Sequence, residues 1–169
     1  MTTNPMREVL IEKVTANIGV GSPGERFDNA KALLARLTDR TPVETVARRR
    51  EPAFKIRQGM AIGVKVTMRG KHAYEFVEKA LAARKRIIAA RNFDKQGNVA
   101  FGVPEYIDFP GAKYDPAIGM FGFDVCLTLK RRGWRVAYKR RSTKIGKAHR
   151  ITKDEAVEFM KSRFNAKVE

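Results

Sequence analysis

Three glycines near the start of the chain have the spacing of a phosphate-binding turn. Gly19, Gly21 and Gly24 form G-x-G-x-x-G between a predicted strand and a predicted helix, which is the dinucleotide-binding fingerprint. A plain strand that leaves through glycines into a helix with a Ser22–Glu25 capping box explains the same residues. Since no acidic residue closes the next predicted strand to bind a ribose, a nucleotide-dependent enzyme is kept only as the alternative interpretation.

The other residues with catalytic side chains are isolated from one another. His72 and His149 are far apart and match no recognised spacing. Cys126 is the only cysteine, which excludes an internal disulfide and a cysteine zinc site, and it has no local partner that would make it a nucleophile. Asp108, Asp115 and Asp124 are separated by turns. A metal cluster is the alternative interpretation, but aspartate at such positions usually stabilises the turn itself. We therefore predict no catalytic residue, no metal and no cofactor.

The charge of the chain indicates a polyanionic partner. The 169 residues include 35 Lys and Arg against 18 Asp and Glu, a formal net charge of +17. Such a surplus repels itself in a compact domain, so it is typical of proteins that bind nucleic acid and, less often, an anionic membrane surface. No apolar run is long enough to span a bilayer, and residues 1–6 lack the build of a signal peptide. We expect a cytoplasmic protein.

The positive charge is concentrated in two segments that interrupt the predicted elements. Residues 48–59, here the basic loop, are polar and broken by Pro and Gly, and they read as a long exposed loop. Residues 130–151, here the basic extension, contain no Asp or Glu at all. Phosphates would neutralise such a stretch, and Phe54, Trp134 and Tyr138 lie within the two segments, where aromatic rings can stack on bases.

Alternation and helical periodicity predict the elements that hold these segments. Apolar residues alternate with polar ones in candidate strands at 7–20, 43–47, 61–69, 98–103 and 121–130, and helical spacing appears after residue 22, at 71–91 and after residue 152. Several connections are too short for parallel crossovers. We predict one domain, residues 1–169, of the α+β class: a two-layer sandwich with a mainly antiparallel sheet and helices packed on one face. A turn at Gly133 and a return strand at 134–138 would make the basic extension a hairpin.

The same alternation predicts that one face of the sheet is polar and open. Its residues in the first and third candidate strands are Lys13, Thr15, Asn17, Lys65, Thr67 and Arg69. Because the helices would cover the opposite face, this surface would be free to bind RNA.

Several stretches, taken in order, resemble a known family. Residues 14–21 (VTANIGVG), 54–59 (FKIRQG) and 62–70 (IGVKVTMRG) resemble the universal 5S-rRNA-binding protein family of the large ribosomal subunit, ribosomal protein five of that subunit. Residues 107–115 and 119–125 are similar to it as well, so the resemblance covers nearly the whole chain. Residues 144–152 resemble its archaeal and eukaryotic branch.

The resemblance implies a structural constituent of the large subunit. A member of this family binds 5S rRNA and anchors it in the central protuberance, beside other central-protuberance ribosomal proteins. It also contacts large-subunit rRNA, forms an intersubunit bridge to a small-subunit head protein, and reaches toward P-site tRNA. The implied location is the ribosome in the cytoplasm, with no membrane partner.

The resemblance also implies which residues bind RNA. Family contacts to 5S rRNA correspond to Asn17, Thr67 and Arg40, although the family often has a neutral amide where Arg40 stands. With the predicted open face, the expected 5S rRNA site is Asn17, Arg40, Thr67, Lys13, Thr15, Lys65 and Arg69. The expected tRNA-proximal residues of the basic loop are Arg48, Arg49, Arg50, Phe54, Lys55 and Arg57. The expected rRNA-binding residues of the extension are Arg131, Arg132, Arg135, Lys139, Arg140, Arg141, Lys144, Lys147, His149 and Arg150.

Overall fold

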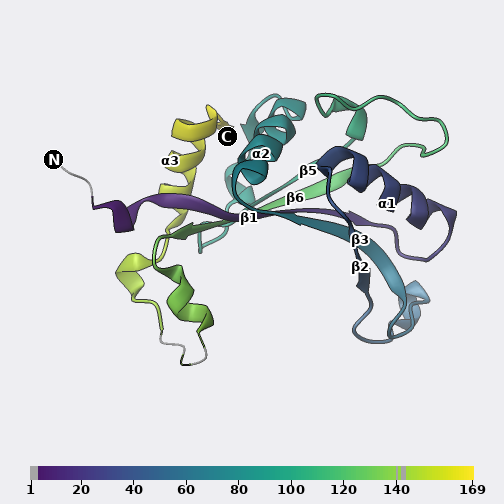
Figure 1. Ribbon diagram of the computed structural model, residues 1–169, viewed down its shortest axis with the longest axis horizontal. Helices are drawn as coiled ribbons and strands as arrows, with labels where there is room; N and C mark the ends of the chain where they lie inside the picture. Colours follow the sequence, from purple (N-terminus) through teal and green to yellow (C-terminus); the bar gives the residue numbers. More distant parts are fainter. Residues whose placement is uncertain (1–3, 140, 142–143) are drawn as a thin grey trace.

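The centre of the molecule is a five-stranded sheet. The computed structural model describes residues 4–139, 141 and 144–169. The strands are β1 (Val9–Gly19), β2 (Val43–Val46), β3 (Ala61–Met68), β5 (Val99–Val103) and β6 (Phe123–Arg131), in the order β2-β3-β1-β6-β5. Each neighbouring pair is antiparallel, which confirms the sheet predicted from alternation (Figure 1).

Three helices cover one face of this sheet. They are α1 (Glu25–Thr38), α2 (Lys71–Ala83) and α3 (Lys153–Phe164), and Figure 1 shows all three on the same side of the strands. The core forms between the layers, where Leu34, Val77 and Met160 of the helices are buried together with Val14 and Val125 of the sheet. The predicted two-layer α+β sandwich is confirmed.

The helix ends follow the sequence signals in one case and depart from them in another. Thr152 and Glu155 form the reciprocal capping box at the start of α3. The predicted box at Ser22 is wrong, because α1 begins at Glu25 after Gly24, whose φ is 145°. Gly24 turns the chain into the helix through a conformation that side chains rarely adopt, so Ser22 lies too early to cap it.

The second helix is shorter than its periodicity suggests. It was expected to run to about residue 91, but α2 ends at Ala83. Lys85 and Arg86 have positive φ values of 54° and 60°, which break the helix. The chain continues as β4 (Ile87–Ile88), which pairs in parallel with β7 (Lys167–Val168) at the other end of the sequence. Ile88, inside the range of the predicted helix, is buried in this strand pair instead.

The remaining short helices are 3-10 turns in the connections. They are η1 (Pro5–Arg7), η2 (Pro52–Phe54), η3 (Ala90–Asn92), η4 (Tyr106–Asp108), η5 (Trp134–Tyr138) and η6 (Lys147–His149). The prediction of a return strand at 134–138 is therefore wrong, since that segment is η5. Gly133, with a φ of 82°, leads the chain from the end of β6 directly into this turn. In its described residues the basic extension contains the 3-10 turns η5 and η6 after the end of β6, and no β-hairpin.

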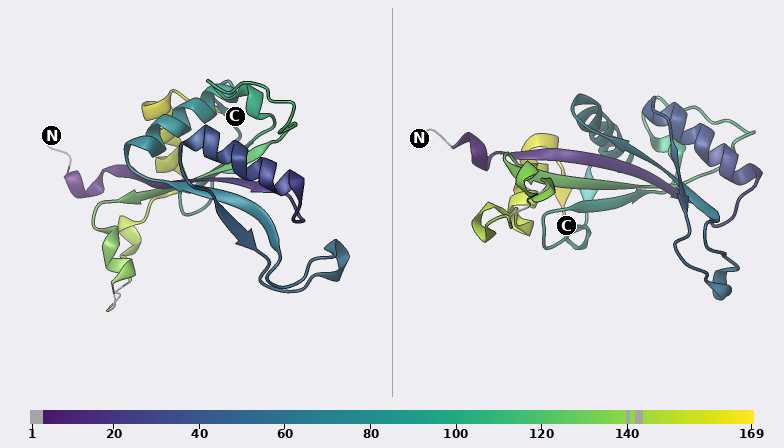
Figure 2. Two further views of the ribbon diagram at one scale, coloured as in Figure 1. Left: turned by 45° about the vertical axis from the view of Figure 1, so that its right-hand side comes forward. Right: turned by 60° about the horizontal axis from the view of Figure 1, so that its bottom comes forward.

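Both basic segments lie on the side of the sheet that the helices leave open. In Figure 1 the basic loop descends from the β2–β3 end and the basic extension from the opposite end. The two views of Figure 2 show the same arrangement, with the segments apart and both directed away from the helical layer. The open sheet face thus forms a floor between two projecting arms.

Candidate nucleic-acid interface

The open sheet face, which is the floor of the candidate interface, is polar, and strand register places side chains of three strands next to one another. Thr15 of β1 lies between Thr67 of β3 and Cys126 of β6, and Asn17 lies between Lys65 and Asp124 in the next row of the same face. Thr67 and Lys65 are exposed, whereas Thr15, Asn17 and Lys13 are half-buried between neighbouring strands. The alternation prediction for this face is confirmed. Its centre combines hydroxyl, amide and ammonium groups, which can bond to phosphate and ribose oxygens, with the Cys126 thiol and the Asp124 carboxylate.

Two predicted residues lie at the margin of the floor. Arg69 is exposed just after the end of β3. Arg40 is exposed in the connection from α1 to β2, three residues before Val43, which pairs with Lys65. Arg40 therefore lies near the edge strand β2, beyond the end of the row that contains Asn17 and Lys65, and not on the floor itself.

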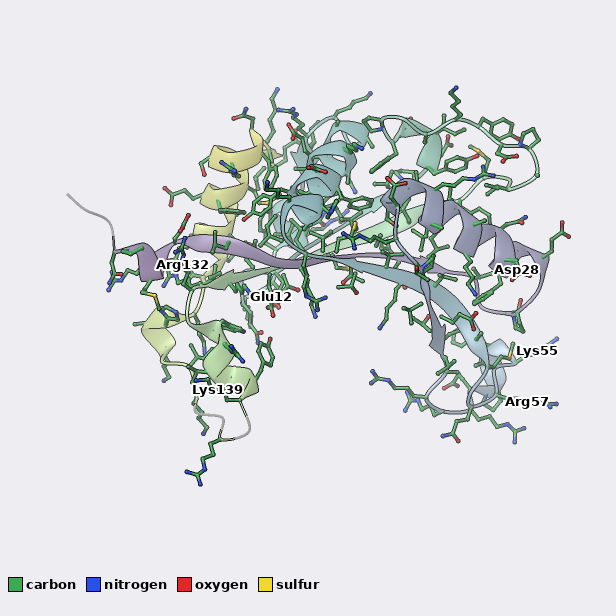
Figure 3. The ribbon with its side chains drawn as sticks, in the orientation of Figure 1. Glu12, Asp28, Lys55, Arg57, Arg132 and Lys139 are labelled. Atoms are coloured by element: carbon green, nitrogen blue, oxygen red, sulfur yellow. The ribbon has the colours of Figure 1, made fainter. Side chains whose placement is uncertain are left out.

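The basic loop has backbone structure of its own. Glu51 and Ile56 exchange backbone hydrogen bonds of 2.9 and 3.1 Å, and the loop base is closed by a 2.9 Å bond from the Gly59 N–H to the Ala47 carbonyl. Five cationic side chains and one ring are exposed along it: Arg48, Arg49, Arg50, Lys55, Arg57 and Phe54. Figure 3 shows Lys55 and Arg57 near the tip of this arm, and Phe54 is 75% exposed.

The basic extension is tied to the body of the protein at several points. The Tyr138 hydroxyl donates to Glu12 Oε1 of β1 at 3.3 Å, and His149 Nε2 lies 2.8 Å from the Arg132 carbonyl oxygen. Arg132 pairs with Glu8 at 3.0 Å across the start of β1. These contacts hold the arm beside the sheet, with Lys139 on its outer side in Figure 3.

Most of the predicted cations of this extension face solvent, and one is internal. Arg132, Arg135, Lys139, Arg141, Lys144, Lys147 and Arg150 are exposed, while His149 is half-buried. Arg140 lies outside the described residues. Arg131 is only 6% exposed, and its guanidinium donates to Glu155 at 2.5 Å and to the Ala148 carbonyl at 3.1 Å. This side chain joins β6, the end of the extension and α3, so in this structure it is turned away from any RNA on the open face.

The geometry gives no support to an enzyme site. The strand before Gly19 is antiparallel to both of its neighbours, whereas a dinucleotide turn belongs to a parallel βαβ unit. Within the described part of the chain, no three His, Cys, Asp or Glu side chains gather where a metal ion could bind. Partial burial, and then the nearby Asp124 carboxylate, raise the pKa of the Cys126 thiol, which disfavours the reactive thiolate.

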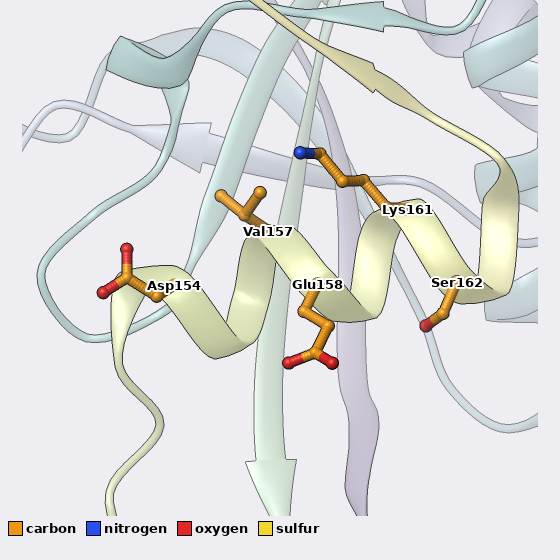
Figure 4. Close-up of a pocket in the computed structure, with 5 residues that line it drawn as sticks. All are labelled: Asp154, Val157, Glu158, Lys161 and Ser162. Atoms are coloured by element: carbon orange, nitrogen blue, oxygen red, sulfur yellow. The ribbon is translucent and has the colours of Figure 1, made fainter.

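A hollow on the helical side is also unlike a catalytic cleft. Figure 4 shows that its lining comes from one helix, α3, with Asp154, Val157, Glu158, Lys161 and Ser162 along its outer surface. Its charged groups have opposite signs and it is remote from the basic loop and the open sheet face (Figure 1). Among the described residues, no helix is long and apolar enough to cross a membrane.

The sequence patterns missed two acidic residues that shape the interface. Glu12 sits at a register shift in β1 between Ile11 and Lys13, and only a break in the alternation before it hinted at this bulge. Asp124 faces the floor beside Asn17. Alternation along β6 places it on this face, but its position next to Asn17 depends on the order of the strands in the sheet. Arg131 had a usable signal, since it continues the inward series of Phe123, Val125, Leu127 and Leu129.

Comparison with known proteins gives a consistent result across the chain. Residues 4–57 match the family model described as ribosomal protein L5, and residues 61–165 match the C-terminal model of the ribosomal L5P family. The chain is 52% identical over 169 residues to the large ribosomal subunit protein uL5 of Sulfurisphaera tokodaii, covering 99% of this chain and 96% of that one. It is 45% identical over 168 residues to the protein of the same name from Methanococcus maripaludis strain C7, covering 97% and 93%.

Proposed function

Because the chain belongs to the ribosomal protein L5 family, whose members are structural constituents of the large ribosomal subunit and not enzymes, we propose that it binds 5S rRNA. The RNA lies on the open sheet face and is anchored through it in the central protuberance. The basic extension contacts large-subunit rRNA, and the basic loop lies against P-site tRNA. Other central-protuberance proteins and a small-subunit head protein complete the set of partners, and the ribosome is in the cytoplasm.

One observation carries this proposal: the sheet face left open by the helices is polar and lies between two basic arms. Thr67, Thr15 and Asn17 form its centre, where neutral donors and acceptors suit ribose 2′-hydroxyls and phosphate oxygens. The exposed cations of the arms supply the sequence-independent attraction that a chain of net charge +17 can offer. RNA would be recognised by its shape and backbone more than by base sequence.

The test is selective binding of purified 5S rRNA by the full chain. Wild type, Thr67→Ala and the control Ser162→Ala are titrated with 5S rRNA and with a size-matched tRNA across a salt series. Ser162 is an exposed hydroxyl on α3, so its removal leaves the open face unchanged. We expect preference for 5S rRNA at moderate salt and weaker binding for Thr67→Ala alone.

The salt series gives a second readout. If about six phosphates are neutralised, log affinity should fall with log salt at a slope of roughly −4 to −5. Equal affinity for both RNAs, or a nearly flat salt response, would contradict the proposal. If Thr67→Ala and Ser162→Ala weaken 5S rRNA binding equally, the open sheet face is not the binding site.

A further inference from the structure

A groove separates the basic extension from the underside of the sheet. Its volume is about 800 Å³, within the range of roughly 300–1,000 Å³ typical of small-ligand sites. Its walls come from β1, β6, the turn before β5 and both halves of the extension. The lining residues used below are Glu12, Lys95, Trp134, Tyr138, Lys144 and Arg150.

The groove combines aromatic walls with a cationic rim. Trp134 is half-buried and Tyr138 is 68% exposed, four residues apart in η5, so each presents ring surface that no other described aromatic residue covers. Lys95, Lys144 and Arg150 reach the groove from separate segments, and none of them forms an ion pair within the described residues. Rings beside unpaired cations are the features of sites that bind unstacked nucleotides.

Glu12 restricts what can occupy this groove. Its carboxylate accepts from the Tyr138 hydroxyl through Oε1, and no described cation pairs with it. Figure 3 shows Glu12 on the sheet side, facing the extension. A carboxylate repels phosphate and accepts hydrogen bonds only, so its neighbour must be a donor. The amino groups of adenine, cytosine and guanine are such donors.

We propose that this groove binds an unpaired nucleotide of the rRNA, with its base on the Trp134 and Tyr138 rings and its amino edge toward Glu12. The flanking phosphates lie against Lys95, Lys144 and Arg150. The inference rests on the proposed rRNA function but concerns a surface separate from Thr67 and Asn17. A basic protein tail, the other candidate occupant, would meet three lysine and arginine side chains of its own sign.

The experiment uses Trp134, the only tryptophan, as a reporter inside the groove. The full chain is titrated with adenine, cytosine and uracil hexaribonucleotides, a base-paired RNA hairpin, a poly-glutamate peptide and a lysine-rich peptide. We expect saturable fluorescence quenching by the adenine and cytosine hexamers, several-fold weaker binding of the uracil hexamer, and little effect of the other probes. If the hairpin or poly-glutamate quenches as strongly as the hexamers, the groove binds polyanions in general. If the lysine-rich peptide does so, the groove is a protein-binding site. Either result overturns the proposal.

Three variants separate the contributions. Tyr138→Ala should weaken adenine hexamer binding about tenfold, the order expected for loss of one stacked base. Glu12→Gln, which can donate as well as accept, should abolish the discrimination against uracil. Tyr114→Ala is the matched control, because Tyr114 is 56% exposed in the connection before β6, outside both basic segments, and its loss should leave quenching unchanged. No effect of Tyr138→Ala, or uracil discrimination that survives Glu12→Gln, overturns the proposal.

The outcome is independent of the 5S rRNA test. If the hexamers do not quench while 5S rRNA still binds selectively, the groove inference fails and the proposed function stands. If the hexamers quench as expected while 5S rRNA binds no better than tRNA, the proposed function fails and the groove remains a single-strand site.

Discussion

Arg131 and Glu155 form a contact that holds three parts of the molecule together. The arginine side chain is 7% exposed and the glutamate 38%, and Arg131 also bonds the Ala148 carbonyl. Glu155 at the same time accepts the Thr152 N–H through Oε2 at 3.0 Å. The pair therefore links the end of β6, the end of the basic extension and the start of α3.

Glu155→Gln should destabilise the fold because it leaves a buried guanidinium without a counter-charge. Glutamine keeps an oxygen for the Thr152 N–H, so the helix cap survives. The expected cost is about 1–3 kcal/mol in the free energy of unfolding, measured by urea denaturation followed through Trp134 fluorescence. Glu158→Gln, an exposed neighbour on the same helix, should change it by less than about 0.5 kcal/mol. Equal effects of the two substitutions would mean that the buried pair contributes nothing.

Asp115 is a single residue that should make the stability of the fold depend on pH. The hydrogen bond from Arg36, at 2.7 Å, and then the N–H of Ala117 hold the pKa of its carboxyl below the ordinary value of 3.8. A carboxyl with a depressed folded pKa adds stability that is present above 3.8 and is lost as the pH falls through the folded value. Lowering the pH from 5 to 3 should therefore reduce the Tm of wild type more than that of Asp115→Asn.

The control for this comparison is Asp108→Asn, since Asp108 is exposed in the same connection and forms no ion pair among the described residues. It should retain the full wild-type loss between pH 5 and 3. Parallel Tm curves for wild type and Asp115→Asn would show that the Arg36 contact does not stabilise the fold. Because the Arg36 side chain is 63% exposed and that of Asp115 is 29% exposed, the effect should also shrink as salt is added.

At the scale of elements, the alternation of buried and exposed residues along each strand explains which features of the fold the sequence could predict. Val64, Val66 and Met68 alternate with Lys65 and Thr67 because one sheet face is covered, and a covered face imposes a period of two. The open face followed from this pattern alone. The start of α1 and the end of α2 did not, since they depend on backbone angles at Gly24, Lys85 and Arg86 that periodicity does not encode. The 3-10 form of 134–138 likewise follows a backbone angle, the positive φ of Gly133, that alternation does not encode.

The basic loop provides the element-scale prediction. Arg48, Arg49 and Arg50 are exposed, and none is in an ion pair within the described part of the chain, so replacing all three by Ala should leave the Tm almost unchanged. If each neutralises one phosphate, the slope of log affinity for the ribosomal RNA partner against log salt should become less negative by roughly 2–3. The measurement is a salt titration of binding to isolated large-subunit RNA and to tRNA.

The matched control removes the same charge from the helical side, through Lys71, Lys79 and Lys161 replaced by Ala. These lysines are exposed on α2 and α3, which cover the opposite face of the sheet. Their loss should leave the slope within error of wild type. If both triple variants make the slope less negative by the same amount, RNA binding depends on total charge and the basic loop makes no specific contribution.

At the scale of the whole molecule, the sheet order places the arms on one side. The basic loop leaves between β2 and β3, and the basic extension follows β6, so strand order sets the width of floor between them. The sequence identified both segments by charge, but their position on one face required the order β2-β3-β1-β6-β5. The Glu12 contact and the groove beside it depend on the same arrangement.

The last prediction concerns the net charge of +17, which acts in opposite directions on folding and on binding. Only four ion pairs are present among the described residues, so most cations repel one another in the free protein. Salt screens this repulsion over about 10 Å at 0.1 M, so the Tm of the free chain should rise between 0.05 and 0.5 M KCl. RNA affinity should fall over the same range, because each counterion released from the phosphates gains less entropy when the bulk salt concentration is higher. The Arg48, Arg49 and Arg50 triple variant should show a smaller rise in Tm, because part of the repulsion is already gone. A Tm that is flat or falls with salt would show that the basic arms are too far apart to strain the fold, and that their charge acts on RNA alone.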